Sequence, residues 1–353
     1  MKKLLLLFQL ILLANTEMFS EVRVSGIIDT DTKWRAENGP YVIEGDIIVS
    51  PQARLSISPG TEVIISTKNR SPSPTPFDRL DSSLVSIRVF GAFSSEGSRE
   101  DPIIFTSSEP AFETYNWRGI ILEDVAHHFT EISFTEINGA TTAITVKNSR
   151  PLIRNNIIEN NNIAIHCLQG GSARIQNNVF SRNFTAAIKV ELSNPVIVNN
   201  IIAFNRNVGM WCDNISKITF EHNCLFANRD VDFVNCDPEM GLLSRVNQNG
   251  DSTDAFYNLY SDPIFSGTAS ERRAIELDTD LPTERVNIVD TTLAQVLYDQ
   301  LPDSVQIKNR PEKFRSRYSL SIYSPCHNAG KPHESFNNTD GTTNTIGVQG
   351  GPN

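Results

Sequence analysis

Asparagine recurs at a fixed spacing among alternating apolar and polar residues in the middle of this chain. The last asparagine of an Asn-Asn or His-Asn pair returns every 22 or 23 residues. Each of these asparagines is followed, five residues later, by another asparagine. The first series is Asn156, Asn178, Asn200 and Asn223, and the second is Asn161, Asn183, Asn205 and Asn228. A fixed period of this length indicates stacked structural units, none of which buries its apolar face alone.

Between the asparagines, each unit has a small residue, an apolar residue directly after it and a second apolar residue two positions later. The small residues are Gly119, Ala143, Ala164, Ala187 and Gly209. The apolar residues are Ile120, Ile144, Ile165, Ile188 and Met210, followed by Leu122, Val146, Cys167, Val190 and Cys212. Alternation with a period of two predicts short strands with one buried face.

Short strands, this period and the lack of a crossover helix predict an all-β fold, a parallel β-helix solenoid. Each coil adds about 4.8 Å, so about ten coils from Gly45 to Phe265 predict a rod of roughly 48 Å. Identical positions then stack into columns, and the apolar columns fill the interior. An asparagine side chain both donates and accepts, so it can bond the coils above and below it. Asparagine also tolerates the left-handed conformation that tight corners need.

The two ends of the chain do not follow the repeat. Residues 1–20 have two lysines before an apolar stretch too short to span a membrane, which is typical of a signal peptide. We therefore expect a protein secreted to the periplasm, the cell surface or the medium. Residues 21–266 are expected to form the β-helix with its N-terminal cap. Residues 267–316 carry a helical pattern at 291–301 and predict a partly helical insertion, and residues 317–353 predict a segment that closes the same domain.

Charge and cysteine content limit the partners. The net charge is −10, so there is no surplus of lysine and arginine for binding nucleic acid. We also expect the protein to be a monomer. The five cysteines include no CxxC motif, which argues against a zinc site. Cys212 and Cys236 fall about one coil apart, close enough to form a disulfide. Cys224 occupies the inward place that Ile157 and Val179 take in earlier units, so we expect it to be buried.

Characteristic segments flank the repeat at both ends. They include Asp-Pro-Ile-Ile-Phe-Thr at 101–106, Trp-Arg-Gly-Ile at 117–120, Asp-Pro-Ile-Phe at 262–265 and Ser-Pro-Cys-His-Asn-Ala-Gly at 324–330. In these segments the chain resembles the secreted right-handed parallel β-helix repeat proteins, which share the pectin lyase-like fold. The resemblance implies the fold but no single activity, because the family includes polysaccharide lyases, glycoside hydrolases and surface proteins. The segments that mark a pectate lyase or polygalacturonase active site are not found.

The repeat itself indicates one candidate binding surface. Residues that follow the inward positions point outward and stack from coil to coil. One outward column is Ile121, Thr145, His166, Lys189 and Trp211, and the next is Glu123, Lys147, Leu168, Glu191 and Asp213. In enzymes that this chain resembles, the substrate lies along the outer face of one sheet. We therefore take His166, Trp211, Lys147 and Glu123 as candidate substrate-binding residues. Trp211 offers a flat ring for a sugar, although it can equally pack under a loop.

Lys189, Glu191 and Asp213 are the candidate catalytic residues on the same surface. Glu191 and Asp213 lie in adjacent coils, so their carboxylates are expected about 5 Å apart, near the separation in retaining glycosidases. In a lyase, Lys189 would abstract the proton, and Ca²⁺ held by the two carboxylates is the one candidate cofactor. The alternative is a solvated acidic column that Lys147 and Lys189 partly neutralise.

Three functions therefore stay open. The first, which we favour, is an exported protein that binds extracellular or envelope polysaccharide along the outer surface of this sheet. The second is a polysaccharide lyase or glycoside hydrolase. The third is a structural or adhesive surface protein without a glycan site.

Overall fold

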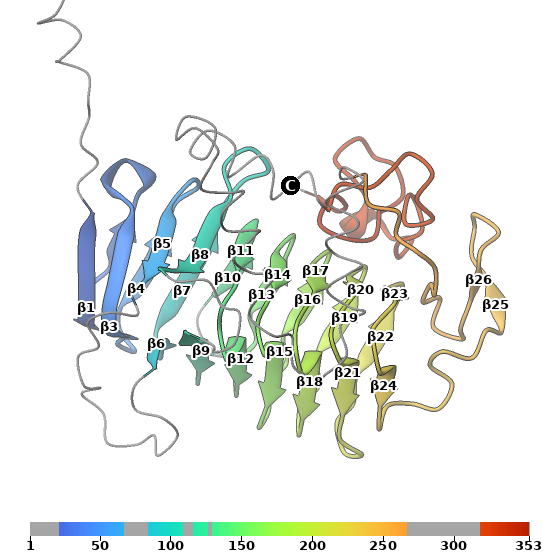
Figure 1. The fold of residues 1–353 in the computed structure, drawn as a ribbon, viewed down its shortest axis with the longest axis horizontal. Helices are drawn as coiled ribbons and strands as arrows, with labels where there is room; N and C mark the ends of the chain where they lie inside the picture. The colour runs from blue at the N-terminus through green and yellow to red at the C-terminus, as the bar shows by residue number, and fades with distance from the viewer. Residues whose placement is uncertain (1–20, 67–83, 109–115, 126–128, 267–317, 353) are drawn as a thin grey trace, which may run out of the picture.

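The structure is a computed structural model, and it describes residues 21–66, 84–108, 116–125, 129–266 and 318–352. Its strands stack into the predicted all-β parallel solenoid, in which each coil contributes one strand to each of three faces (Figure 1). Among the described residues, no helix is long and apolar enough to cross a membrane. The signal peptide predicted at 1–20 and the helix predicted at 291–301 lie outside the described residues.

The three faces are named here by their strands. Face 1 contains β5 (Glu62–Ile65), β8 (Ile103–Ser107), β11 (Thr135–Ile137), β14 (Ile157–Glu159), β17 (Val179–Ser181), β20 (Ile201–Ala203) and β23 (Cys224–Phe226). Face 2 contains β6 (Val85–Val89), β9 (Trp117–Glu123), β12 (Thr142–Lys147), β15 (Ile163–Leu168), β18 (Ala186–Glu191), β21 (Val208–Cys212) and β24 (Val231–Val234). Face 3 contains β2 (Thr32–Trp34), β4 (Arg54–Ile57), β7 (Ala92–Glu96), β10 (Glu131–Ser133), β13 (Leu152–Arg154), β16 (Arg174–Gln176), β19 (Val196–Val198) and β22 (Thr219–Glu221).

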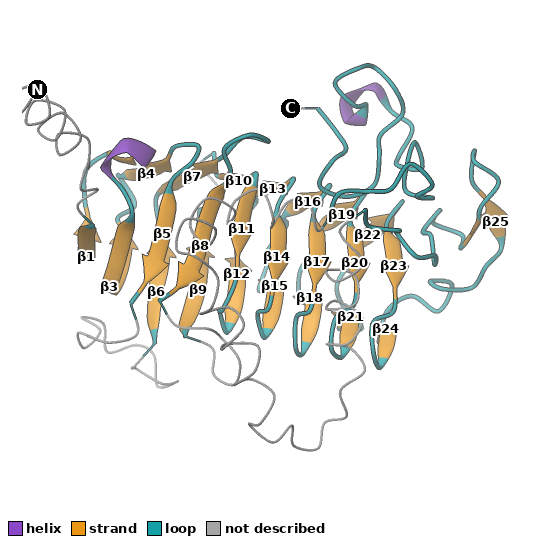
Figure 2. Cartoon of the chain, turned by 45° about the horizontal axis from the view of Figure 1, so that its top comes forward, coloured by secondary structure: helices purple, strands orange, loops and turns teal. Residues whose placement is uncertain are grey.

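The first coil joins faces 1 and 2 into one sheet. β3 (Tyr41–Val49) is long enough to pair with β5 in its first half and with β6 in its second half. β1 (Val22–Ile28) pairs with the other edge of β3 and covers the N-terminal end of the solenoid. At the opposite end, β25 (Arg245–Val246) and β26 (Ser252–Thr253) form a short antiparallel pair. Figure 2 shows faces 1 and 2 as one continuous surface.

The solenoid has fewer coils than predicted. Face 3 is an 8-stranded sheet, so the chain completes about eight coils rather than about ten, and the rod is roughly 38 Å long. The difference arises because the prediction divided the whole span by one period. The described chain from 235 to 266 does not add stacked strands in step with that period.

Two apolar clusters form the core. The inward residues of the repeat, such as Ile144, Ile165 and Ile188, belong to one cluster inside the solenoid, as predicted. Residues 318–352, which we call the closing segment, lie over the outer side of face 1 near β17, β20 and β23 (Figures 1 and 2). The second cluster forms between the closing segment and face 1.

Cys224 is buried as predicted, but on the other side of the sheet from the predicted one. Neighbouring residues in a strand point to opposite faces, and Leu225 belongs to the cluster inside the solenoid. Cys224 therefore points outward, as do Ile157 and Val179, and all three are covered from outside. The prediction of an inward Cys224 is wrong because an apolar column was taken as proof of an interior position.

The asparagines form two hydrogen-bonded ladders, which confirms their predicted role. In the first ladder, Nδ2 of Asn156, Asn178 and Asn200 donates to Oδ1 of the asparagine in the next coil at 2.9, 2.9 and 3.0 Å. The ladder continues through Asn223 and Asn258 and ends at the buried carboxylate of Asp254. The second ladder runs from Asn161 through Asn183 and Asn205 to Asn228, and ends at Asp232.

In each Asn-Asn pair, the first asparagine has the left-handed conformation at the corner, whereas the second asparagine forms the first ladder. Asn155, Asn177 and Asn199 have φ of 54°, 56° and 60°. Their side chains point outward and hold the closing segment. Nδ2 of Asn155 donates to the Gly350 carbonyl at 2.8 Å, Nδ2 of Asn177 donates to the Thr345 carbonyl at 2.9 Å, and Oδ1 of Asn199 accepts from the Lys331 amide at 2.8 Å. Each Asn-Asn pair thus bonds coil to coil with one side chain and binds the closing segment with the other.

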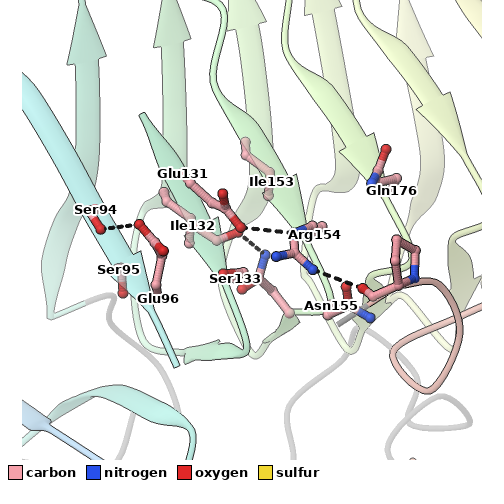
Figure 3. Close-up of polar contacts among 12 residues, drawn as sticks. Ser94, Ser95, Glu96, Glu131, Ile132, Ser133, Ile153, Arg154, Asn155 and Gln176 are labelled. Atoms are coloured by element: carbon pink, nitrogen blue, oxygen red, sulfur yellow. Dashed lines mark hydrogen bonds and ion pairs between the residues drawn. The ribbon is translucent and has the colours of Figure 1, made fainter. Parts of the chain in front are cut away.

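Face 3 also contacts the closing segment. Arg154 on β13 donates from Nε to Glu131 of the preceding coil at 2.8 Å, and its Nη1 donates to the Pro352 carbonyl at 3.0 Å (Figure 3). The Glu131 and Arg154 side chains are both largely buried, with 7% and 18% of their surface exposed. The ion pair therefore fixes the arginine that binds the end of the closing segment.

Cys212 and Cys236 form the predicted disulfide, with their Cα atoms 5.2 Å apart. The bond joins β21 to the chain that follows β24, at the last coil. Cys167, Cys224 and Cys326 are buried thiols.

Candidate functional site on the outer surface of face 2

Strand pairing on face 2 has the predicted register. Lys189 on β18 is paired with His166 on β15 and with Trp211 on β21. Glu191 is paired with Leu168 in the same way. Since all of these residues occupy outward positions, the structure brings the predicted column together over three consecutive coils.

His166, Lys189 and Glu191 form one hydrogen-bonded cluster. Nε2 of His166 lies 2.6 Å from Oε2 of Glu191, and Nζ of Lys189 lies 3.1 Å from the same oxygen. The Glu191 side chain keeps 35% of its surface exposed, against 18% for His166. One carboxylate oxygen thus organises an imidazole and an ammonium group, and the cluster still faces solvent.

The charge states in this cluster follow from burial and from the contacts. Burial would raise the pKa of Glu191, but the hydrogen bonds from Lys189 and His166 outweigh it and hold that pKa below its usual value. Burial lowers the pKa of His166, and the charge of Lys189 acts in the same direction. At neutral pH we therefore expect an ionised Glu191 and a neutral His166. Because the carboxylate can only accept, Nε2 of His166 must carry the proton.

Trp211 lies beside this cluster. Its side chain is half-buried, and Nζ of Lys189 lies 4.9 Å from the centre of the indole ring, within the range of a cation–π contact. Lys189 therefore connects the indole ring to the Glu191 carboxylate. A ligand on this surface would meet an aromatic ring, a cation and an anion within adjacent coils.

Glu123 on β9 lies two coils toward the N-terminus from β15, and Lys147 on β12 lies one coil toward it. Nζ of Lys147 lies 2.5 Å from Oε1 of Glu123, and Nη2 of Arg88 lies 3.0 Å from Oε2. Burial opposes ionisation of Glu123, but these two cations outweigh it and lower the pKa of Glu123. Arg88 was missed from the sequence because the amino-acid sequence before β6 does not follow the repeat, so the register of β6 could not be counted from it. Arg88 is paired with Ile121 on β9, which puts Arg88 in the outward column that contains Ile121 and His166.

Asp213 has a different role from the one predicted. Its Oδ2 accepts a hydrogen bond from the Leu192 amide at 2.6 Å, and its Oδ1 accepts from the amides of Ser216 and Ile215 at 2.7 and 3.0 Å. Both oxygens are therefore used to fix the turn after β21 to the turn after β18. Asp213 is therefore not free to act with Glu191 as a carboxylate pair, or to bind Ca²⁺ at the predicted site.

Asp213 should remain ionised to unusually low pH. Burial opposes this weakly, but the hydrogen bonds from Ser216, Leu192 and Ile215 bring its pKa to about 2. Because the pKa is depressed in the folded state, the stabilisation by Asp213 is complete above the ordinary aspartate pKa and is lost as the pH falls through about 2. A carboxyl carbon NMR titration measures this pKa directly. A midpoint near the ordinary aspartate value would contradict the turn-fixing role.

Within the described ranges, no group of three or more histidine, cysteine, aspartate or glutamate side chains is placed to hold a metal ion. The residues that the structure brings together are His166, Lys189, Glu191 and Trp211, with Glu123, Lys147 and Arg88 as a neighbouring cluster.

Comparisons with known proteins agree with this architecture. The family model described as "Right handed beta helix region" matches residues 108–241. No curated protein sequence matches the chain. Among solved structures, the crystal structure of the periplasmic alginate epimerase AlgG matches at 13% identity and a TM-score of 0.27, over 66% of this chain and 68% of that chain. That TM-score is too low to support any conclusion about fold or function, so the agreement rests on the family model alone. From its strand topology and the matched region, the chain is a right-handed parallel β-helix repeat protein.

Proposed function

We propose that this chain is an exported protein that binds an extracellular or envelope polysaccharide along the outer surface of face 2. One observation carries the proposal: Trp211 lies within adjacent coils of the His166–Lys189–Glu191 cluster on a surface that the closing segment does not cover. An aromatic ring contacts the apolar face of a sugar, while fixed charged groups bind its hydroxyl groups or carboxylate.

The repeating geometry of the surface also supports a polymeric ligand. The two charged clusters and Trp211 are distributed along the axis of the solenoid at intervals of about 4.8 Å per coil. A chain of sugar units laid along this axis would meet similar groups in successive coils. Arg88, Lys147 and Lys189 supply the cations for an acidic polysaccharide, and Glu123 and Glu191 keep their side chains oriented.

Export is part of the proposal. The pattern of residues 1–20 is that of a signal peptide, and the Cys212–Cys236 disulfide is typical of an oxidising compartment. We infer a location in the periplasm, at the cell surface or in the medium, and a monomeric protein.

Trp211→Ala should weaken polysaccharide binding about tenfold or more, the effect of losing roughly 1.4 kcal/mol. The measurement is retention of the purified mature chain in gels that contain one of a panel of acidic and neutral polysaccharides, followed by calorimetry on the one that binds. Tyr323→Ala, which removes an exposed aromatic residue of the closing segment, is the matched control and should bind normally. Equal affinity of both variants and the unchanged protein would refute the assignment of this surface.

A lyase or hydrolase that uses the same surface is the second candidate. It is favoured by the 2.6 Å contact between Glu191 and His166, since a neutral imidazole whose tautomer is fixed by a carboxylate is a suitable general base. Lys189, the base proposed from the sequence, is instead bound to Glu191. Unsaturated products by ultraviolet absorbance would indicate a lyase, and new reducing ends alone a hydrolase. In either case Glu191→Gln should abolish turnover while binding persists.

A further inference from the structure

Two of the three free cysteines lie together beneath the closing segment. Cys224 points outward from β23, and Cys326 belongs to the closing segment that covers it. Both side chains are fully buried and belong to the same apolar cluster. The thiols of Cys224 and Cys326 are close enough to interact, and Cys224 Sγ donates to the Ser261 carbonyl at 3.3 Å.

The backbone holds both cysteines in place. The Cys224 amide donates to the Asn200 carbonyl at 2.8 Å in the parallel ladder of face 1. On the other side, the Cys326 carbonyl accepts from the Ile346 amide at 3.0 Å, and the Cys326 amide donates to Ser324 Oγ at 3.2 Å. Both cysteines are thus held in place by hydrogen-bonded backbone on the two sides of the same apolar cluster.

We infer that Cys224 and Cys326 form a second disulfide, which fastens the closing segment to the outer side of face 1. In this step the two S–H bonds break and one S–S bond forms. The two electrons and two protons pass to a disulfide oxidant: oxidised glutathione leaves as two molecules of reduced glutathione, and a thiol–disulfide oxidoreductase leaves in its dithiol form. The inference goes beyond the proposed function and does not depend on the ligand.

The bond must form before the closing segment packs. Thiol–disulfide exchange requires a thiolate, and the contact with Cys326 together with burial raises the pKa of Cys224 well above its usual value. Cys167 is buried alone inside the solenoid, and burial raises its pKa to about 12, so it stays a thiol. The odd number of cysteines is then accounted for by two disulfides and one inert buried thiol.

The disulfide would also protect an apolar surface. Ile157, Val179 and Ile201 form the outward column of face 1 that the closing segment covers. Loss of the segment would expose this column as a continuous apolar stripe, which is a site for aggregation. A covalent link across 102 positions of sequence, from 224 to 326, prevents that opening.

Peptide mapping without reduction tests the inference. The unfolded mature chain is refolded in a glutathione redox buffer, under conditions in which the Cys212–Cys236 peptide is found, then denatured and alkylated at low pH and digested. We expect a linked peptide that contains Cys224 and Cys326 and is two hydrogens lighter than its parts, with Cys167 alkylated. Recovery of Cys224 and Cys326 as alkylated thiols beside an intact Cys212–Cys236 peptide would overturn the inference.

Thermal unfolding gives a second, independent measurement. In a Cys212→Ser/Cys236→Ser background, addition of reductant should lower the midpoint of unfolding, because the second disulfide remains to be reduced. The further substitution Cys326→Ser should remove this response, whereas Cys167→Ser should leave it intact. A midpoint that does not respond to reductant in the background protein would also overturn the inference.

Discussion

Asn178→Ala should lower the free energy of unfolding by about 3 kcal/mol or more. Asn178 is fully buried at the centre of the first ladder. Its Nδ2 donates to Asn200 at 2.9 Å and to the Ile153 carbonyl at 3.0 Å, and its Oδ1 accepts from the backbone and the side chain of Asn156. The substitution therefore leaves several buried groups without this partner, and each such loss costs about 1–3 kcal/mol.

Chemical denaturation monitored by circular dichroism measures this loss. Asn162→Ala is the matched control, because Asn162 lies next to a ladder asparagine but is only half-buried, with a side-chain hydrogen bond from Thr185 in an exposed position. The control should change stability by less than about 1 kcal/mol. Equal effects of the two substitutions would show that the ladder contributes no more than an ordinary surface asparagine.

Glu159→Gln should destabilise the protein by roughly 3–5 kcal/mol and loosen the closing segment first. The Glu159 side chain is 2% exposed, and its Oε2 lies 2.5 Å from Nη2 of Arg182 and 2.5 Å from the hydroxyl of Tyr318. The neutral amide removes the carboxylate that balances a largely buried guanidinium. It also removes the charged acceptor to which Tyr318 anchors the closing segment on face 1.

Hydrogen exchange resolves this effect by segment. Exchange should accelerate over residues 318–352 before it does so in the interior strands, because local opening of the closing segment needs less free energy than global unfolding. Glu221→Gln is the control, because Glu221 on face 3 also forms an ion pair with the closing segment, through Lys331. The Glu221 and Lys331 side chains keep 25% and 33% of their surface exposed. Exposed pairs contribute up to about 1 kcal/mol, so a control as damaging as Glu159→Gln would refute the distinction.

The closing segment also limits where a ligand can bind. It covers the outer side of face 1 over β14, β17, β20 and β23, through the second apolar cluster and the three corner asparagines. Within the part of the chain that the structure describes, face 2 carries no such cover over His166, Lys189 and Glu191, which are part-exposed and bonded to one another. The side of the solenoid available to a polysaccharide is thus decided by segments that are distant in sequence.

The fold and the composition of the outward columns follow from the amino-acid sequence alone. A period of 22 or 23 residues fixes which residues stack, because parallel strands in register repeat the same position in every coil. The ladders from Asn156 and Asn161, the neighbours of Lys189 and the Cys212–Cys236 disulfide all follow from counting along that period.

What each column faces, and how its charges pair, depends on contacts between segments that are distant in sequence. Cys224 and Ile157 have the composition of an interior column, but the distant closing segment covers them from outside, so apolar character alone could not distinguish the two sides. Asp213 follows Glu191 by one coil in the sequence register. Its oxygens nevertheless accept hydrogen bonds from three backbone amides, two in its own turn after β21 and one in the turn after β18. The position of Arg88 beside the site is seen only from the pairing of β6 with β9. Periodicity specifies neighbours along the solenoid axis, whereas turns and covering segments, which do not repeat, decide what those neighbours can bind.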